Sequence, residues 1–440
     1  MESVSRRKFL RHTTATAAAM IIPAHVLGGS AHTAPSDKLN LAGVGIGGVG
    51  KNYLENVNSE NIIALCDVDT EFARPVFEIY PDARQFIDFR EMLDEMPEID
   101  GVVIGTPDHT HAVVALEAIR RNTHVYCAKP LTRTVHESRI LTRAAADSPV
   151  ATQMSIQTNA AEDHRVLTEW IRDGAIGDVR EVHIWSNRPI WPQGIETPTA
   201  IPSCPPTLDW SLWIGPAPYR HYHPAYHPFN FRGWYDFGAG ALGDMGCHQF
   251  DPVVKALKLK FPESIYASST QLFEDTYPQA SIIYYNFPAR QDMPSVKVIW
   301  YDGGLKPERP EVLEAERQFG DWNGGIFFIG DSGTILCSAV GRHPRIIPEH
   351  KMQAYTRPPK TLPRSIGHYE EWIAACKGGD PAGADFSYGG PLTELVLLGN
   401  VAVRRQKRLY WDTAAARFKD DEEANKLLQE PCHNGWSLEY

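Results

Sequence analysis

Short apolar runs alternate with stretches of helical periodicity from residue 38 to about residue 157. Strands separated by helices form a parallel sheet, because each crossover helix returns the chain to the same end of the sheet. The pattern therefore predicts a doubly wound α/β domain, a Rossmann domain, over residues 35–158. The predicted strands are 39–44, 62–66, 84–86, 101–104, 124–127 and 150–154, with helices such as 112–121 and 135–146 between them.

The pattern changes after a predicted helix at 159–173. Residues 179–185 alternate between polar and apolar, and later strand-like runs follow one another without crossover helices, which is typical of an antiparallel sheet. We therefore predict that residues 159–440 form an α+β domain with a mostly antiparallel, open-faced sheet. Its free face favours a homodimer or homotetramer. The expected strands are 264–270, 280–287, 295–301, 326–329 and 334–337, and the expected helices are 241–257, 369–377 and 392–404.

Residues 187–237, between these two patterns, have little periodicity and are rich in proline and aromatic residues. Two interpretations stay open: a long loop packed by its own rings, or a carbohydrate surface on which rings stack against the C–H faces of a sugar. Arg232 and Trp234 are candidate substrate contacts in this segment. His221, His223 and His227 have a spacing that would permit a metal, but each lies beside Pro or Tyr in a loop, and we predict no metal site.

A glycine run follows the first predicted strand. Gly45, Gly47 and Gly50 form a G-x-G-x-x-G pattern between a strand and a helix, where backbone N–H groups can hold a diphosphate. Asp67, at the end of the second strand, lies about 20 residues further on, where a carboxylate can accept the hydroxyls of an adenine ribose and repel a 2′-phosphate. The combination predicts NAD as cofactor, with Ile46, Gly48 and Val49 completing the binding run.

Two places offer the groups that a dehydrogenase needs besides its cofactor. Lys129 directly follows the fifth strand, at the edge of the sheet where nicotinamide is expected, and could hold a substrate oxygen or act as a base. Asp244 and His248 are four residues apart, so they project from one face of a predicted helix. These three residues are the predicted catalytic and substrate-binding group, and the pattern leaves open whether Lys129 or His248 is the base.

Charge and composition argue against some classes of binding partner. A net charge of -11 over 440 residues argues against nucleic acid or an anionic membrane surface as partner, and no apolar run after residue 34 is long enough to span a bilayer. The run Ser5-Arg6-Arg7-Lys8-Phe9-Leu10 matches the twin-arginine export pattern S-R-R-x-F-L, so residues 1–34 are predicted to be a signal peptide and the mature protein to be periplasmic. Twin-arginine transport moves folded proteins, so the cofactor would be loaded before export.

Taken together, the motifs GVGIGGVG, ALCDVD, VVIGTPDHTHA, AKP and GALGDMGCH resemble those of the glucose–fructose oxidoreductase/inositol dehydrogenase (Gfo/Idh/MocA) family over nearly the whole chain after the leader. The resemblance implies that the substrate lies over the nicotinamide, between Lys129 and the helix of Asp244 and His248. It also implies cofactor contacts from the glycine run and a further set of residues: Asp67, Thr106, Pro107, His109, His111, Lys129 and Gln157. One departure is Ala128, because the family usually has Glu before the Lys.

The family implies a small carbohydrate as substrate. The predicted function is an exported NAD-dependent oxidoreductase that oxidises or reduces a secondary hydroxyl of a sugar or glycoside. One alternative is a glycosidase that uses bound NAD for transient oxidation and elimination. Another is a non-catalytic NAD-carrying sugar-binding protein, which would have no need of Lys129, Asp244 and His248 together.

Overall fold

The computed structural model describes residues 37–440; the predicted signal peptide lies outside the described residues. Its first domain is a six-stranded sheet in the order β3-β2-β1-β4-β5-β6, with every neighbouring pair parallel. The predicted doubly wound Rossmann architecture is confirmed. The strands are β1 (Asn40–Val44), β2 (Asn61–Cys66), β3 (Arg84–Phe86), β4 (Gly101–Ile104), β5 (His124–Cys127) and β6 (Thr152–Met154).

Helices flank this sheet and bury its central strands. The middle strands read as nearly continuous apolar runs because they are buried on both faces. The carboxyl ends of β1, β2, β4 and β5 meet at one edge, where ligands bind in folds of this kind. The surrounding elements are η2 (Ile46–Gly50), α3 (Lys51–Asn56), α4 (Thr70–Ile79), α5 (Phe89–Glu95), η3 (Asp108–Thr110), α6 (His111–Arg120) and α7 (Val135–Ala146).

The second domain contains a nine-stranded sheet in the order β13-β12-β11-β7-β10-β9-β8-β14-β15. All pairs are antiparallel except β10 with β7, so the predicted mostly antiparallel sheet is confirmed. The strands are β7 (Val179–Ser186), β8 (Ser264–Ser269), β9 (Ser281–Phe287), β10 (Val296–Tyr301), β11 (Gly324–Gly330), β12 (Thr334–Ser338), β13 (Arg345–Ile347), β14 (Leu409–Asp412) and β15 (Arg417–Lys419).

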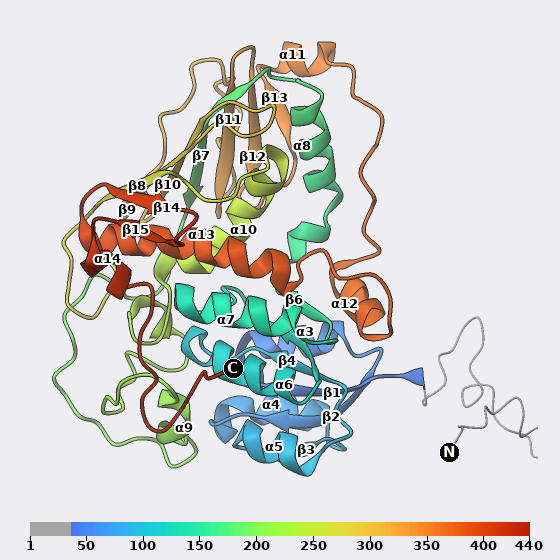
Figure 1. Ribbon diagram of the computed structural model, residues 1–440, viewed down its shortest axis with the longest axis vertical. Helices are drawn as coiled ribbons and strands as arrows, with labels where there is room; N and C mark the ends of the chain where they lie inside the picture. The colour runs from blue at the N-terminus through green and yellow to red at the C-terminus, as the bar shows by residue number, and fades with distance from the viewer. Residues whose placement is uncertain (1–36) are drawn as a thin grey trace, which may run out of the picture.

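Helices α10 and α13 lie between the nine-stranded sheet and the Rossmann domain. In Figure 1, α13 crosses the molecule between the upper sheet and the lower Rossmann domain, with α7 beside it. The predicted helix at 159–173 is instead a short turn followed by α8, because the chain is extended at Ala161. The helices of this half are η4 (Gln157–Ala160), α8 (Glu162–Arg172), α9 (Trp210–Ile214), η5 (Asn230–Gly233), α10 (Gly240–Leu257), α11 (Glu349–Ala354), α12 (His368–Cys376), α13 (Phe386–Arg405) and α14 (Glu422–Lys426).

Helix α12 packs on the first domain although it lies far along the chain. Trp372 is fully buried in the same apolar cluster as Leu41 and Tyr126, and Lys377 forms an ion pair with Glu60 at 2.8 Å. Figure 1 shows α12 beside the lower domain. The core of the Rossmann domain therefore includes residues from beyond the predicted boundary at 158.

The aromatic segment, residues 187–237, runs along the first domain, and α9 lies at its lower end near the end of the chain (Figure 1). It is held to the strand ends by backbone hydrogen bonds: Asp209 N–H donates to Val68 at 2.8 Å and Thr70 N–H donates to Thr207 at 3.0 Å. Among residues 37–440, no helix has the length and apolarity to cross a membrane.

Candidate active site

One cavity of about 380 Å³ opens at the carboxyl edge of the Rossmann sheet. Its walls come from the glycine turn after β1, from the ends of β2, β4 and β5, and from the aromatic segment. Among the predicted site residues, those that line it are Gly45, Gly48, Val49, Asp67, Thr106, Pro107, His111, Lys129 and Arg232. Ala128, at the position of the family's usual Glu, also lines it.

The glycine turn is built so that strand, turn and helix can approach closely. Gly45 has a φ of +74°, a left-handed conformation that side chains with a Cβ rarely adopt. A Cβ at Gly50 would overlap the carbonyl oxygen of Gly45, so α3 packs against the strand only because this residue has no side chain. At Gly48, by contrast, a Cβ would meet only the ring of Phe72 at 3.9 Å, which leaves the backbone open to the cavity.

Asp67 anchors this turn. Its Oδ2 accepts hydrogen bonds from the N–H groups of Ile46 at 2.8 Å and Gly47 at 2.9 Å, and its Oδ1 accepts one from Asp69 at 3.0 Å. Burial raises the pKa of the Asp67 carboxyl, against the lowering effect of these donors. The predicted acid at the end of β2 thus lies beside the glycine turn and in the cavity wall, where a ribose hydroxyl could reach it.

The loop after β4 presents two histidines in different settings. Both ring nitrogens of His111 lie 2.9 Å from carbonyl oxygens, those of Pro130 and Thr106, and the ring lines the cavity. His109 lies 2.9 Å and 3.2 Å from the carbonyl oxygens of Trp213 and Phe237, and burial lowers its pKa to about 3. His109 therefore supports the aromatic segment, and its cofactor contact stays a prediction.

Lys129 is fixed at the end of β5. Its backbone N–H donates to the Ser155 hydroxyl at 3.0 Å, and that hydroxyl lies 2.8 Å from the Tyr53 hydroxyl. Its Nζ donates to the Asp244 carboxylate at 2.6 Å and to the Asp244 carbonyl at 2.7 Å. The side chain thus bridges the two domains at the cavity wall.

Asp244 is the centre of a cluster of cations. Besides Lys129, Arg188 Nε lies 3.2 Å from Oδ2 and Arg232 Nε lies 3.4 Å from Oδ1. Burial alone would raise the pKa of this carboxyl, but Lys129, Arg232 and Arg188 hold it well below its usual range. Asp244 is therefore ionised near neutrality, and because its carboxylate oxygens already face three cations, it is not free to accept a substrate proton.

His248 follows Asp244 by one turn of α10, as predicted. Burial, aided by the nearby Lys129 cation, lowers its pKa to about 3, so the ring is neutral near pH 7. Within the described chain neither ring nitrogen has a hydrogen-bond partner, in contrast to His109 and His111. A neutral imidazole with an unused lone pair can accept a proton.

Two further predicted residues lie away from the cavity. Trp234 is only 1% exposed, and its indole N–H donates to Ala225 at 2.8 Å within the aromatic segment's own core. The predicted substrate contact is therefore corrected: this ring has no surface to offer a ligand. Gln157 donates weakly to the Tyr369 hydroxyl at 3.4 Å, and its cofactor role stays a prediction.

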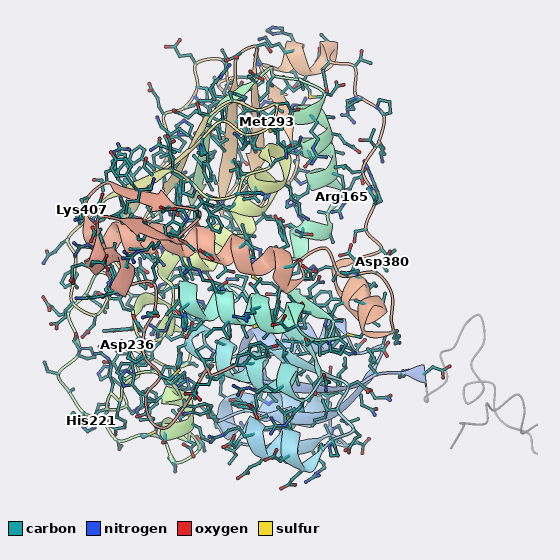
Figure 2. All side chains as sticks on the ribbon, in the orientation of Figure 1. Arg165, His221, Asp236, Met293, Asp380 and Lys407 are labelled. Carbon is teal, nitrogen blue, oxygen red and sulfur yellow. The ribbon has the colours of Figure 1, made fainter. Side chains whose placement is uncertain are left out.

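The aromatic segment is a long loop packed partly by its own rings, and its role as a carbohydrate surface stays a prediction. Some rings form a core of their own, whereas Trp213, Phe229 and Phe231 line the cavity. Residues 37–440 contain no cluster of three or more His, Cys, Asp or Glu side chains arranged to hold a metal. His227 instead lies 2.8 Å from the Asp69 carboxylate, and His221, labelled in Figure 2, is exposed at the edge of the molecule.

The end of the chain closes the same cavity from another side. Trp436 lines it, stacks on Phe89 at 5.9 Å between ring centroids and lies under Arg90 at 4.4 Å. His433 N–H donates to Pro216 at 3.0 Å. No sequence signal pointed to this closure, because residues 433–436 carry no motif and meet the first domain only through the fold.

Two functional candidates were also missed. Arg188 directly follows β7 and reaches Asp244, 56 positions away in sequence. Asp108 is buried in the cavity wall, where its carboxylate accepts from Ala239 N–H at 3.0 Å. Burial raises the pKa of Asp108, while His111, Arg232 and Lys129 oppose that shift.

Two models of one family match the chain. Residues 39–155 match its NAD-binding Rossmann fold and residues 186–288 match its C-terminal alpha/beta domain, together about half of the chain. The chain belongs to the Gfo/Idh/MocA oxidoreductase family. Its first domain is the NAD-binding Rossmann domain of that family, as the glycine run predicted.

Curated relatives match mainly over this first domain. The levoglucosan dehydrogenase of Pseudarthrobacter phenanthrenivorans is 29% identical over 164 residues, which are 37% of this chain and 34% of that protein. The inositol 2-dehydrogenase of Acidothermus cellulolyticus is 26% identical over 163 residues, 36% of this chain and 48% of that protein. The chain thus matches between about a third and a half of the length of these relatives.

Solved structures share the fold over most of the chain. The WlbA dehydrogenase of Bordetella pertussis, solved with NADH and UDP-GlcNAcA, has a TM-score of 0.60 at 16% identity and covers 85% of this chain and 99% of its own. The aldose-aldose oxidoreductase of Caulobacter crescentus has a TM-score of 0.55 at 15% identity and covers 85% of this chain and 99% of its own.

The residues present fit an NAD molecule. At Gly48 the backbone is open to the cavity, with only the Phe72 ring within 4 Å of an added Cβ, and Asp67 provides the acidic partner. The Thr106 hydroxyl is buried in the cavity wall with no partner among the described residues, which is a polar atom that a ligand can satisfy. The glycine turn and Asp67 would hold the adenosine diphosphate half, and Lys129, at the end of β5, would face the nicotinamide half.

Proposed function

We propose that this protein is an exported NAD-dependent oxidoreductase that acts on a secondary hydroxyl of a sugar or glycoside. The observation that carries the proposal is the single cavity with the glycine turn in one wall and Lys129 in another, where Lys129 is bonded to Asp244. NAD, when bound, supplies the hydride acceptor or donor. The relatives named levoglucosan dehydrogenase and inositol 2-dehydrogenase support a sugar or polyol as substrate.

Each polar residue of the site has a role that follows from its bonds. The Lys129 ammonium, which already donates to Asp244, is a hydrogen-bond donor with no lone pair to accept a proton. It orients a substrate oxygen, and Asp244 positions it. His248, neutral and with both ring nitrogens unused, accepts the hydroxyl proton in oxidation and returns it in reduction. Of the two candidate bases, we therefore propose His248.

The cavity wall suits a carbohydrate and a retained cofactor. Trp213, Phe229 and Phe231 give apolar faces on which sugar C–H groups can stack. The aromatic segment and Trp436 cover the cleft, and the contact of His227 with Asp69 closes it beside the glycine turn. A retained cofactor serves an enzyme that works where free NAD is scarce, and it also serves the alternative glycosidase.

The test is whether the purified protein carries NAD and whether sugars change its absorbance at ~340 nm. We expect NAD to be released on denaturation and to be reduced by at least one sugar or glycoside in a panel. A protein with intact fold that binds no NAD, or whose NAD no sugar changes, contradicts the proposal. Product analysis separates the two enzymes, because a keto-sugar indicates a dehydrogenase, whereas cleavage without net NADH indicates a glycosidase.

Export and assembly are separate parts of the proposal. The twin-arginine pattern at Arg6 and Arg7 supports transport to the periplasm, and replacing both by Lys should leave the protein in the cytoplasmic fraction. Exposed apolar side chains at Leu305, Val312 and Trp322, on the connection between β10 and β11, support a homodimer or homotetramer. Light scattering on the purified protein measures that state directly.

A further inference from the structure

The candidate site gathers more positive charge than its catalytic role needs. Lys129, Arg188 and Arg232 all lie within 3.4 Å of one carboxylate, that of Asp244. Neither arginine has an ion pair with any other acid among residues 37–440. One carboxylate is therefore shared by three cations, all of them largely shielded from water.

Asp108, the other acid of the site, does not neutralise the surplus positive charge. Asp108, counted as fully ionised, still leaves three cations against two carboxylates, and burial raises its pKa, which only increases the surplus. His248 is neutral. A diphosphate at the glycine turn after β1 lies two strands away from β5, roughly 10 Å, so it does not neutralise this cluster either. At least one positive charge remains, and partly buried charge is costly unless it is paired.

The two arginines keep donors available. Arg188 uses Nε for Asp244 and Nη1 for Asn187 and Asn323, whereas no acceptor in the described chain takes its Nη2. Arg232 uses Nη1 for the Phe229 carbonyl at 3.0 Å, and its Nη2 is likewise unused. The planar guanidinium matches the geometry of an oxyanion.

Arg232 is also held in place by aromatic rings. Its guanidinium lies 4.6 Å and 4.5 Å from the ring centroids of Phe229 and Phe231, and it lines the cavity. Such stacking fixes the orientation of the fork without consuming its in-plane donors. A fixed cation with free donors in a cleft wall is a preorganised anion site.

We propose that the substrate is a sugar acid, whose carboxylate is bound by Arg188 and Arg232 while Lys129 and His248 face the hydroxyl that reacts. This rests on the proposed function and names its substrate class. A carboxylate carries one negative charge, which matches the minimum surplus, whereas a phosphate monoester carries nearly two. In the reaction the C–H bond gives its hydride to NAD, the O–H proton goes to His248, and the carboxylate stays unchanged.

The experiment compares matched sugars on the full-length protein loaded with NAD. The probes are methyl glucuronide, methyl galacturonide and methyl mannuronide, each with its neutral methyl ester and with the parent methyl glycoside. We expect kcat/KM for at least one acid to exceed that of its ester by about 30-fold, as expected for loss of charge-assisted hydrogen bonds. Equal or faster turnover of the neutral forms overturns the inference and leaves the proposed function standing.

Variants of Arg188 and Arg232 test whether these two residues cause the preference for the acid over its ester. Arg188→Gln should lower the ratio of acid to ester turnover at least about 10-fold, and Arg188→Lys should lower it less, because it keeps the charge without the fork. Arg180→Gln is the matched control, since Arg180 lies on β7, the strand that precedes Arg188, but its side chain is 48% exposed and pairs with Asp331. An unchanged ratio in Arg188→Gln and in Arg232→Gln contradicts the assignment.

Two further outcomes are distinguishable. Glucose 6-phosphate is added to the panel as a doubly charged probe, and if it alone is oxidised, the carboxylate assignment is wrong. If no sugar is oxidised at all, the proposed function fails, and titration calorimetry decides the inference separately: the three uronides should bind the NAD-loaded protein more tightly than their esters, and equal or absent binding overturns it.

Discussion

Asp244 contacts three cations, whereas Lys129 contacts one carboxylate. Loss of Asp244 should therefore destabilise the fold more than loss of Lys129. At an effective dielectric constant of about 20, each contact near 3 Å is worth roughly 5 kcal/mol before desolvation. Asp244→Asn loses all three contacts at once and leaves three cations repelling one another. Lys129→Met loses one contact, and Asp244 keeps Arg188 and Arg232. We therefore expect a loss of about 3–5 kcal/mol in the free energy of unfolding for Asp244→Asn, and about 1–2 kcal/mol for Lys129→Met.

Calorimetric melting of the purified variants at pH 7 measures this difference. With roughly 2–4 °C per kcal/mol for domains of this size, Asp244→Asn should melt about 6–20 °C below the parent and Lys129→Met about 2–8 °C below it, so the first shift should be at least about twice the second. Lys51→Met is the matched control, because its ammonium lies 4.0 Å from Glu55 in an exposed pair.

The pH dependence of the stability difference between these two variants follows from the lowered pKa of Asp244. A depressed carboxyl pKa stabilises the folded state above the unfolded value of 3.8, and this contribution is lost only as the pH falls below that value. The gap between the two variants should therefore be flat from pH 6 to pH 8. If Lys129→Met proves as destabilising as Asp244→Asn, the carboxylate is not the shared partner and the charge argument built on it is wrong.

Three other expectations follow from the site. His248→Gln should reduce kcat by about 10²- to 10⁴-fold while the NAD content of the purified protein stays at the parental level, and unchanged turnover would remove His248 from the chemistry. Gly50→Ala, whose Cβ overlaps the Gly45 carbonyl, should lower the NAD recovered after denaturation at least tenfold, and parental NAD content would contradict this role of the turn. His109 has a folded pKa of about 3, so the unfolded state binds more protons below pH 6.5, and stability falls by about 1.4 kcal/mol per pH unit from there down to pH 3. His109→Gln should flatten that acid limb in urea titrations at pH 7 and pH 5, and an equal slope in both proteins would contradict it.

Local patterns predicted the fold well, because buried parallel strands and amphipathic helices are encoded over a few neighbouring residues. The strands at 84–86, 101–104 and 124–127 have the predicted bounds. Edge strands β13 and β15 escaped prediction, because a three-residue strand has no periodicity of its own; β3 is equally short, but the alternation of strands and helices around it indicated its place.

The site was predictable only where chemistry is local in sequence. Asp244 and His248 share a helix face, so their spacing revealed them. Arg188 follows β7 and meets Asp244 of α10 only when this helix packs near that strand within the second domain, and nothing in its sequence neighbours marks it. Trp234 shows the opposite error, since an aromatic residue in an aromatic segment carries no sign of whether it faces a ligand or its own core.

The closure by Trp436 sets an order of events during synthesis. The glycine turn leaves the ribosome early, yet one wall of its cavity is supplied by residues 433–436, which are made last of the described elements. A nascent chain can therefore fold its Rossmann sheet and meet NAD long before it can enclose it. A chain that stops before residue 433 lacks this wall of the cavity, although the strands of the Rossmann sheet and helix α12, which packs on them, are already made.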